Sequence, residues 1–478
     1  MADPVSSLPP APGVEAIPRN ARWVLPVTIL GSSLGFIDST VVNVALPAMQ
    51  SGLNSTLATM QWVINGYMLM LASLMLLGGS LGDRFGRKRT FGAGLVIFAL
   101  ASVVCGAASS AGWLIAARVL QGAGASLLVP ASLAIIGTAY SKEARGRALG
   151  TWSAAAAIMT AAGPPLGGWL VDTVGWRSIF FINPPIAAAA LILLTRLPPD
   201  TGLVSKRLDL LGSALAIAML GLFSYGLIAL GEGGRAVAIM AALASVPVAA
   251  IFVFVERRSA APMLPLGLFR NRAFSGANLL TVVLYAALSG AMFMLPFMLI
   301  RVHHYTATEA GATFLPFSVI MGAGSRWAGG LSDKIGARLP LIGGPLLTAC
   351  GFLWFATHGA DARFLSGPLP GLLLIGVGMT FAIPPLTSTV FNSVPEQASG
   401  IASGINNAAA RGGGLVAVAA IGIAFGGADL SAIEPGEFQA AYRVVMLSAA
   451  VLALLSAVCA AVTISPKDVC KKPAAANR

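Results

Sequence analysis

The sequence predicts an all-α integral membrane protein, and three observations support this prediction. Of 478 residues, 56% are hydrophobic and only 10% are charged, whereas about 25% of the residues in an ordinary soluble domain are charged. The mean hydropathy is +0.83. The apolar residues form continuous runs rather than an alternating pattern, which excludes a closed β-barrel. A cytosolic enzyme, a secreted disulfide scaffold and a nucleic-acid-binding protein are excluded as well.

Fourteen apolar runs approach the length of a membrane-spanning helix, which needs about 20 apolar residues. The first run continues to about Pro47 with no convincing small-residue cleavage site, so it predicts a spanning helix rather than a signal peptide. The connections are short, and no sizeable soluble domain is expected. The predicted spans are 23–47, 60–80, 91–109, 113–139, 148–171, 178–195, 208–230, 236–255, 274–299, 310–331, 339–357, 368–392, 398–425 and 441–464.

The positions of Lys and Arg predict the orientation of these spans, because basic residues gather in cytoplasmic loops. With the N-terminus in the cytoplasm, most basic residues fall on the cytoplasmic side, including a cluster at 84–89. The opposite side then holds only Arg177, Arg235, Arg301, Arg363 and Arg443. Both termini are therefore predicted to be cytoplasmic. The net charge of +12 is explained as a topology signal, and no nucleic-acid partner is expected.

An internal repeat predicts the architecture of the bundle. Residues 79–88 and 329–338 share Gly, Leu, Asp, a basic residue and Gly in register, and 144–150 weakly match 398–404. Spans 1–6 and 9–14 are therefore expected to be two parallel copies with two helices inserted between them. Such repeats indicate a secondary transporter with its substrate site between the halves. The predicted divisions are a tail 1–22, a six-helix bundle 23–200, inserted helices 201–258, a second bundle 259–465 and a tail 466–478.

Four motifs, in the right order, resemble those of the major facilitator superfamily, and particularly its fourteen-span drug:proton antiporters. Residues 79–89 resemble the cytoplasmic loop signature, 163–168 the fifth-helix antiporter motif, and 38–47 the first-helix motif of these antiporters. The fourth-helix motif is matched by Leu114, Arg118, Gln121, Gly122 and Gly124. Met159 replaces an earlier Gly of the antiporter motif, and Ala337 stands where the first loop copy has Arg87. The resemblance covers essentially the whole chain and implies the major facilitator fold, two six-helix bundles plus two inserted helices.

Asp38 is the strongest candidate for a proton-coupling residue. It is the only one of eighteen acidic residues that sits deep in an apolar run, where a carboxylate is costly and usually functional. Arg118 is its expected partner, since the two lie about 13 and 10 Å from the same membrane face at 1.5 Å per residue. Arg stays charged, so its predicted role is to tune Asp38. Purely structural roles for both residues remain open alternatives.

The loop signature is the second candidate site. By resemblance it forms a cytoplasmic gate that makes and breaks contacts as the halves move, with Asp333 as its weaker second copy. A merely solvated basic surface is the alternative for its charged residues. The predicted gate residues are Gly79, Asp83, Arg84, Gly86, Arg87 and Asp333.

The antiporter motif is expected to bend the fifth span and to permit close helix contact, although a simple packing kink explains the same residues. Its predicted members are Gly163, Pro164, Gly167 and Gly168. Six further residues are candidates for a substrate cavity, and each is also compatible with ordinary helix packing, lipid contact or a structural role. They are Trp62, Asn65, Tyr67, Phe293, Phe297 and Arg411.

These observations predict a proton-coupled secondary transporter of the cell inner membrane. It would export small lipophilic compounds. A cationic substrate is expected because Asp38 is the only deep acid, and the scarcity of charge also suits a neutral or lipid-like substrate. The expected partners are the substrate, protons and the lipid bilayer. We expect a monomer without metal, cofactor or enzymatic activity, and no phosphate-binding loop for ATP is visible. The main alternative is a dedicated exporter or flippase of one metabolite or lipid; a membrane enzyme or a channel are further alternatives.

Overall fold

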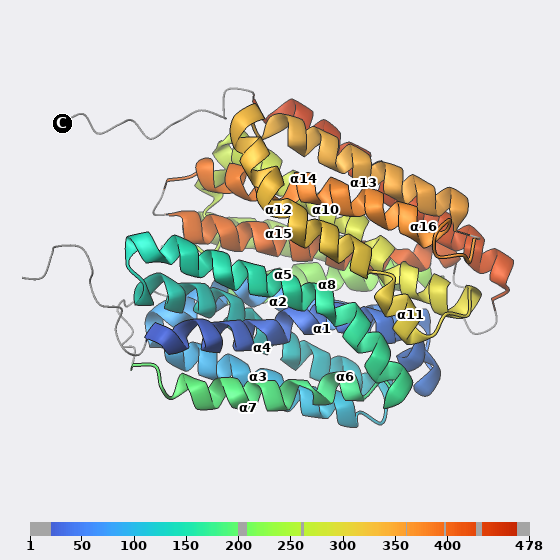
Figure 1. Cartoon of the computed structure of the whole chain (residues 1–478), viewed down its shortest axis with the longest axis horizontal. Helices are drawn as coiled ribbons and strands as arrows, with labels where there is room; N and C mark the ends of the chain where they lie inside the picture. The colour runs from blue at the N-terminus through green and yellow to red at the C-terminus, as the bar shows by residue number, and fades with distance from the viewer. Residues whose placement is uncertain are drawn as a thin grey trace, which may run out of the picture.

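The computed structural model describes most of the chain, and all regular secondary structure in the described residues is helical (Figure 1). The described ranges are 21–198, 208–259, 262–359, 361–395, 398–426 and 433–465. The predicted C-terminal tail 466–478 therefore lies outside them, as does nearly all of the predicted N-terminal tail 1–22.

The helices of the first half begin immediately after the short turn η1 (Ala21–Trp23). Their bounds are α1 Val24–Gly52, α2 Leu57–Phe85, α3 Arg87–Ala107, α4 Ala111–Ala139, α5 Lys142–Thr173, α6 Ser178–Phe181 and α7 Asn183–Leu194. The next pair comprises α8 Leu210–Gly231 and α9 Arg235–Arg258. The second half comprises η2 Leu266–Arg270, α10 Arg272–Phe297, η3 Met298–Val302, α11 Ala307–Ala312, α12 Leu315–Ile335, α13 Arg338–His358, α14 Pro368–Asn392, α15 Ser399–Ala420, η5 Ile421–Phe425 and α16 Pro435–Thr463.

Each of the fourteen predicted spans coincides with helix, but twelve helices within the described ranges are long and apolar enough to cross a membrane. The run at 178–195 is divided into α6 and α7, where Asn183 precedes two prolines, and it forms only a shorter apolar helix. The run at 310–331 becomes α11 and α12, and α12 carries Ser325 and Arg326 midway, which lowers its hydropathy. Fourteen spans therefore remain a prediction, as does the orientation of the termini.

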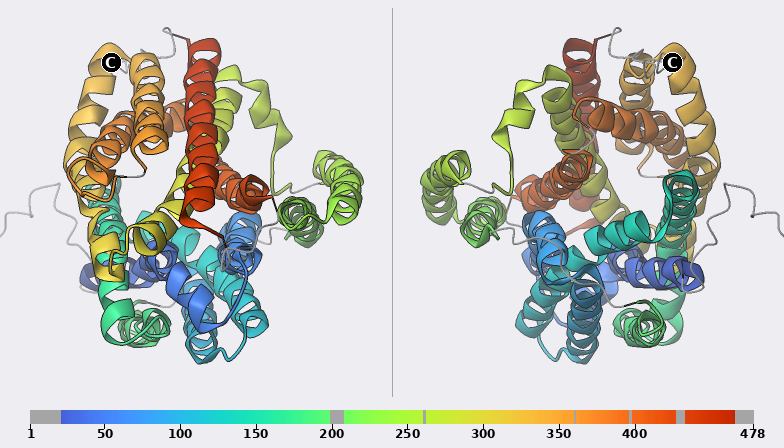
Figure 2. Two further views of the ribbon diagram at one scale, coloured as in Figure 1. Left: turned by 90° about the vertical axis from the view of Figure 1, so that its right-hand side faces the viewer. Right: turned by 90° about the vertical axis from the view of Figure 1, so that its left-hand side faces the viewer.

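The helices pack into two groups, one from α1–α7 and one from α10–α16. Helices α8 and α9 pack on each other, and α8 contacts α2 and α15. In Figure 2 this green pair stands apart at the side of the molecule. The predicted boundaries at residues 200 and 259 stay a prediction, because 199–207 and 260–261 lie outside the described ranges.

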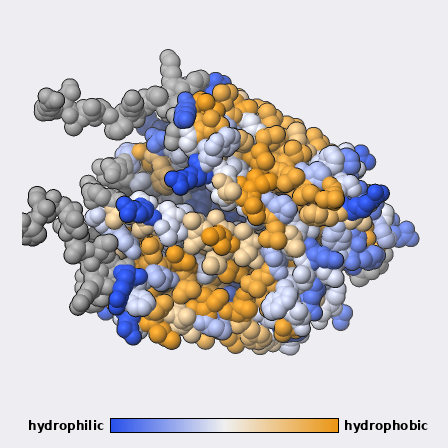
Figure 3. Space-filling model, in the orientation of Figure 1, coloured by the Kyte–Doolittle hydropathy of each residue, from blue (hydrophilic) through white to orange (hydrophobic). Residues whose placement is uncertain are grey.

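The outer surface of the helices is apolar, as a membrane-embedded surface should be. Large hydrophobic side chains such as Leu100, Ile239, Leu243, Val319 and Val462 are exposed, and orange hydrophobic residues cover much of the face in Figure 3. A monomeric soluble protein rarely exposes so extensive an apolar area. Lipid contact explains this surface.

The sequence repeat is also a backbone repeat. Gly86 joins α2 to α3 with a φ of 95°, and Gly336 joins α12 to α13 with a φ of 92°. This region of backbone conformation favours Gly because it has no Cβ. Both turns lie at the left-hand end of the molecule in Figure 1, and α11 lies toward the opposite end. We call the left-hand end the Gly86 end, and the opposite end, which carries α11, the α11 end.

Candidate functional site

A cavity of about 480 Å³ lies between the two helix groups. Its walls come from α1, α2, α5, α10, α12, α14 and α15. The lining extends from Phe314 and Val418, toward the α11 end, to Phe391 at the last turn of α14 and Ser403 in the second turn of α15, toward the Gly86 end. Figure 3 shows the hollow between the halves at this end, bordered by hydrophilic residues. Because the hollow opens at this end and α5 contacts α11 at the other, the cavity is directed toward the Gly86 end.

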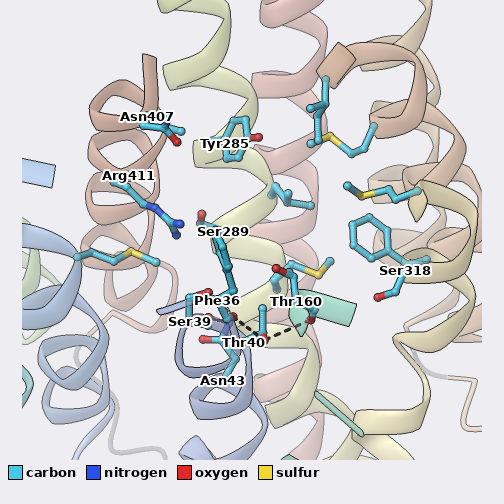
Figure 4. Close-up of a pocket in the computed structure, with 18 of the residues that line it drawn as sticks. Phe36, Ser39, Thr40, Asn43, Thr160, Tyr285, Ser289, Ser318, Asn407 and Arg411 are labelled. Carbon is cyan, nitrogen blue, oxygen red and sulfur yellow. Dashed lines mark hydrogen bonds between the residues drawn. The ribbon is translucent and has the colours of Figure 1, made fainter. Parts of the chain in front are cut away.

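The cavity wall is largely apolar, but it also carries many uncharged polar side chains and one formal charge. Met68, Met292, Met321 and Met379 contribute flexible thioether side chains, and Phe36, Phe314, Phe317 and Phe391 add aromatic surface. Arg411 is the only charged residue among the lining residues. The principal polar side chains are Ser39, Thr40, Asn43, Thr160, Tyr285, Ser289, Ser318, Thr387, Ser403, Asn406 and Asn407, of which Figure 4 labels eight together with Arg411.

Asp38 and Arg118 form a fully buried ion pair between α1 and α4. Their side chains are 0% and 1% exposed, and Arg118 Nη1 lies 2.6 Å from Asp38 Oδ2. Gln121, one turn after Arg118, donates from Nε2 to Asp38 Oδ1 at 2.9 Å, so both carboxylate oxygens have a donor. The same Gln121 accepts from Arg118 Nη1 at 2.7 Å. The structure thus brings together the two residues expected to meet at equal depth.

A second layer of polar contacts holds this pair in place. Arg118 Nε donates to the Val63 carbonyl of α2 at 3.1 Å, and the Tyr67 ring lies 4.3 Å from the guanidinium carbon, within cation–π range. Gln121 Nε2 also donates to Ser102 Oγ at 2.7 Å, and Ser102 accepts from Asn183 Nδ2 at 3.1 Å. Helices α1, α2, α3, α4 and α7 therefore all contribute to one buried network.

The network and the cavity share helix α1. Asp38 faces α4, while the next two residues, Ser39 and Thr40, line the cavity. Successive residues on a helix point about 100° apart, so one turn of α1 serves both sites. Neutralising Asp38 would leave the Arg118 guanidinium without its counter-charge, and the α1–α4 contact would have to change. Such an arrangement can convert a protonation event into a helix displacement next to the cavity.

The Gly86 turn is held within the first helix group. Asp83 pairs with Arg87 at 3.5 Å, Arg87 Nη1 donates to the Ala134 carbonyl of α4 at 3.5 Å, and Lys88 donates to the Leu197 carbonyl. Arg84 stacks on its neighbour Phe85, and Gly79 faces Pro130 of α4. The side chain of Asp333, the predicted second copy, lies outside the described residues.

The glycines of the fifth-helix motif lie where α5 packs closely against other helices. A Cβ on Gly163 would lie 1.9 Å from Thr40 Oγ1, and one on Gly167 would lie 2.4 Å from a Val41 methyl, both on α1. A Cβ on Gly168 would lie 2.1 Å from the Ala307 carbonyl oxygen of α11. From the other side, a Cβ on Gly311 would lie 2.1 Å from the Pro164 carbonyl oxygen. Helix α5 thus joins α1 of its own group to α11 of the other.

Asp172 reinforces this contact at the α11 end. Its carboxylate accepts from the Ala307 and Thr308 amides at 3.1 and 2.7 Å and from Thr308 Oγ1 at 2.6 Å. Elsewhere in the interface, Gln61 Nε2 of α2 donates to the Val418 carbonyl of α15 at 2.6 Å. Together these contacts close the α11 end, whereas the cavity is directed to the Gly86 end. The sequence analysis counted Asp172 only among the acidic residues at span ends. Its position one turn after Gly168 was the available signal that it lies at the same helix contact.

Of the six predicted cavity residues, Arg411 lines the cavity and the other five lie elsewhere. Phe293 and Phe297 are buried and stack on each other at 5.5 Å, and Trp62 packs 6.3 Å from Tyr225 of α8. Tyr67 covers Arg118, and Asn65 is buried without a hydrogen-bond partner among the described residues. The cavity lining that the sequence missed comes mainly from α1, α10, α12, α14 and α15. Clusters of Ser, Thr, Asn and Met in these helices were its main signal.

Two groups of apolar helices around a central cavity directed to one end are typical of a membrane transporter rather than an enzyme. Residues 28–418 match the family model described as Major Facilitator Superfamily. The chain therefore belongs to the major facilitator superfamily, and it is a multi-pass membrane transport protein.

Several relatives are named for drug or antibiotic resistance. The multidrug resistance protein Stp of Mycobacterium tuberculosis (strain CDC 1551 / Oshkosh) is 34% identical over 87% of this chain and 78% of its own length. The methylenomycin A resistance protein of Bacillus subtilis (strain 168) is 35% identical over 84% and 86%. The cephamycin export protein CmcT of Amycolatopsis lactamdurans is 34% identical over 88% of both chains. These relatives place the chain among exporters of small compounds.

The fold is that of solved transporters. A bacterial homologue of the human lysosomal transporter Spinster, in an inward-facing and unoccupied conformation, superposes with a TM-score of 0.68 at 18% identity, covering 95% of this chain and 98% of its own. A bacterial homologue of the human drug peptide transporters PepT1 and PepT2 gives a TM-score of 0.66 at 14% identity, over 94% and 99%. At these identities the similarity concerns the fold alone.

Proposed function

We propose that the protein exports small lipophilic compounds across the inner membrane in exchange for protons, by alternating access. The observation that carries this proposal is the buried Asp38–Arg118 pair on the helix that also forms the cavity wall. Buried ionisable pairs within a membrane are costly and mark ion or proton pathways. Proton exchange requires a group that can bind a proton within the membrane and a substrate cavity coupled to it. The Asp38–Arg118 pair beside the central cavity supports both roles.

In the proposed cycle the α11 end alternates between a closed and an open state. With the Gly86 end assigned to the cytoplasm by its basic loops, the described conformation would admit a substrate from inside. Release outside requires the α5–α11 contact to open. Asp38 would then take up a proton from the outside, weaken its bond to Arg118 and return the proton to the cytoplasm after closure. Substrate and proton compete for one transporter, so their movements are coupled.

The direct test uses everted membrane vesicles with a respiration-driven proton gradient and a pH-sensitive fluorescent dye. Methylenomycin A, tetracenomycin C, a cephamycin and a lipophilic cation would be added singly, because relatives are named for the first three. We expect at least one compound to collapse part of the gradient with the wild-type protein and none to do so in empty vesicles. If transport of a compound proceeds without any proton movement, proton coupling is wrong.

The second candidate is a dedicated exporter of one metabolite. It is favoured by relatives whose names specify single compounds, such as the methylenomycin A and tetracenomycin C proteins. The breadth of response in the same vesicle panel separates the two functions: one responsive compound favours a dedicated exporter, and several of unrelated structure favour multidrug export. We further propose that the two helix groups are the moving bodies within a monomer.

Asp172→Ala should shift the transporter toward an opening at the α11 end. The change removes three hydrogen bonds to a charged acceptor at the start of α11; the carboxylate is exposed, so solvent screens each bond. We expect a several-fold rise in the open population, measured by the distance between spin labels at Val174→Cys and Leu315→Cys in a variant lacking the native cysteines. Thr173→Ala at the neighbouring position is the matched control, since the only side-chain hydrogen bond of Thr173 to a described residue is to the Trp169 carbonyl within α5. Identical distance distributions in all three proteins would contradict this role for Asp172.

A further inference from the structure

We propose that the cavity takes amphipathic compounds with an anionic group, a carboxylate or a phenolate, and that Arg411 binds this group. The inference rests on the proposed export function and specifies its substrate class. It follows from the charge of the cavity wall: among the described lining residues, Arg411 is the only charged one and none is Asp or Glu.

The guanidinium of Arg411 is available to a ligand. It has no hydrogen bond to, or ion pair with, any residue that the structure describes, and its side chain is partly exposed to the cavity. Figure 4 shows it pointing from α15 into the cavity toward Ser289 of α10, with Tyr285 one turn away. An unpaired charge at this depth in a membrane protein is costly. A guanidinium offers five N–H donors suited to a carboxylate, so an anion removes this cost.

Asp38 is not placed to receive a cation. It is fully buried, it is absent from the cavity lining, and its two oxygens are occupied by Arg118 and Gln121. The Tyr67 ring covers the other side of Arg118. A lipophilic cation in the cavity would therefore meet a like charge at Arg411 and no opposite charge on the wall. The expectation from sequence that Asp38 favours cationic substrates has no counterpart in the geometry of the cavity.

The remainder of the wall specifies the rest of the ligand. Met68, Met292, Met321 and Met379 can adapt to rings of different shape, and Phe36 and Phe317 provide flat apolar surface. Near Arg411, the Asn407 amide already donates to the Ser403 carbonyl. The Ser289 and Tyr285 hydroxyls have no hydrogen-bond partner among the residues that the structure describes, so they can donate to a ligand oxygen. A cavity of about 480 Å³ suits an aromatic or alicyclic acid of modest size.

The binding test uses three probes that share one ring system and carry an anionic, a neutral or a cationic head group: 2-naphthylacetate, 2-naphthylacetamide and 2-(2-naphthyl)ethylammonium. Binding to the purified full chain in detergent is measured by isothermal titration calorimetry without a proton gradient. We expect the acid to bind at least tenfold more tightly than the amine. Arg411→Gln should weaken acid binding at least tenfold and amide binding less than threefold, while Arg411→Lys should retain acid binding within a few fold. Equal affinity for acid and amine, or no binding of the acid, would overturn the proposal.

A second measurement requires no bound ligand. Ser289→Cys and Ser318→Cys, each in the variant lacking native cysteines, are allowed to react with the anionic sulfonatoethyl and the cationic trimethylammonioethyl methanethiosulfonates. We expect the anion-to-cation rate ratio to be several-fold higher at position 289 than at 318, and Arg411→Gln should remove the difference. Equal ratios would overturn the proposal even if one probe binds. Neither measurement depends on proton movement, so failure of antiport and failure of the anion site give different results.

Discussion

Asp38→Asn is expected to abolish uphill export, lowering gradient-driven substrate accumulation in everted vesicles at least tenfold, to the level of empty vesicles. The substitution keeps the side-chain shape and removes the only group in the buried network that can carry an exchangeable proton, since Arg118 stays charged. Downhill substrate movement along its own gradient should persist, because the cavity wall itself is unchanged.

A fold-stability control is necessary because Asp38→Asn leaves Arg118 buried without a counter-charge. Removing one partner of a buried ion pair costs about 3–5 kcal/mol. The double variant Asp38→Asn/Arg118→Gln removes both charges and should recover the wild-type melting temperature within a few degrees while remaining inactive in uphill export. Wild-type uphill export by either variant would rule out Asp38 as the proton site.

Gly168→Val is expected to reduce uphill export at least tenfold by preventing closure of the α11 end. A Cβ at this position would lie 2.1 Å from the Ala307 carbonyl oxygen and 2.8 Å from Thr308 Cα. Both obstacles are backbone atoms, so no side-chain rotation can relieve the overlap, and α5 must move away from α11. The spin-label pair at Val174 and Leu315 should then report a longer distance as the main population.

Gly150→Val on the same helix is the matched control, because nothing lies within 4 Å of a Cβ there. It changes the same residue type to the same side chain, with an equal change in helix propensity. We expect it to retain export and the wild-type distance distribution. Equal loss of export in both variants would show that the effect comes from α5 itself rather than from its contact with α11.

The elements that follow from hydropathy alone were predictable from the sequence. Helix is found at each predicted apolar run, and the Gly86 and Gly336 turns share a conformation because their motif repeats. The Asp38–Arg118 contact was also predictable, since only one acid lay deep in a span and its depth matched that of one Arg.

The cavity wall was not predictable in the same way. A span that is apolar on every face gives no signal for its rotation, and Phe293 and Phe297 accordingly lie in the core rather than at the cavity. Interhelical contacts were equally hidden: Gly168 indicated close approach, but its partner Ala307 lies more than a hundred residues away in the chain. Such pairings depend on how the two halves meet, which local patterns do not encode.

The single positive charge on the cavity wall has a consequence for bioenergetics. An anion that leaves the cell and a proton that enters it both carry charge in the direction favoured by an interior-negative voltage. Each elementary charge moved contributes about 2.3 kcal/mol per 100 mV, so exchange of one anion for one proton would draw about 4.6 kcal/mol per 100 mV from the same source. Exchange of a cation for a proton would draw nothing. With Arg411 as its only charged wall residue, the transporter would be driven by membrane voltage even when the pH is equal on both sides.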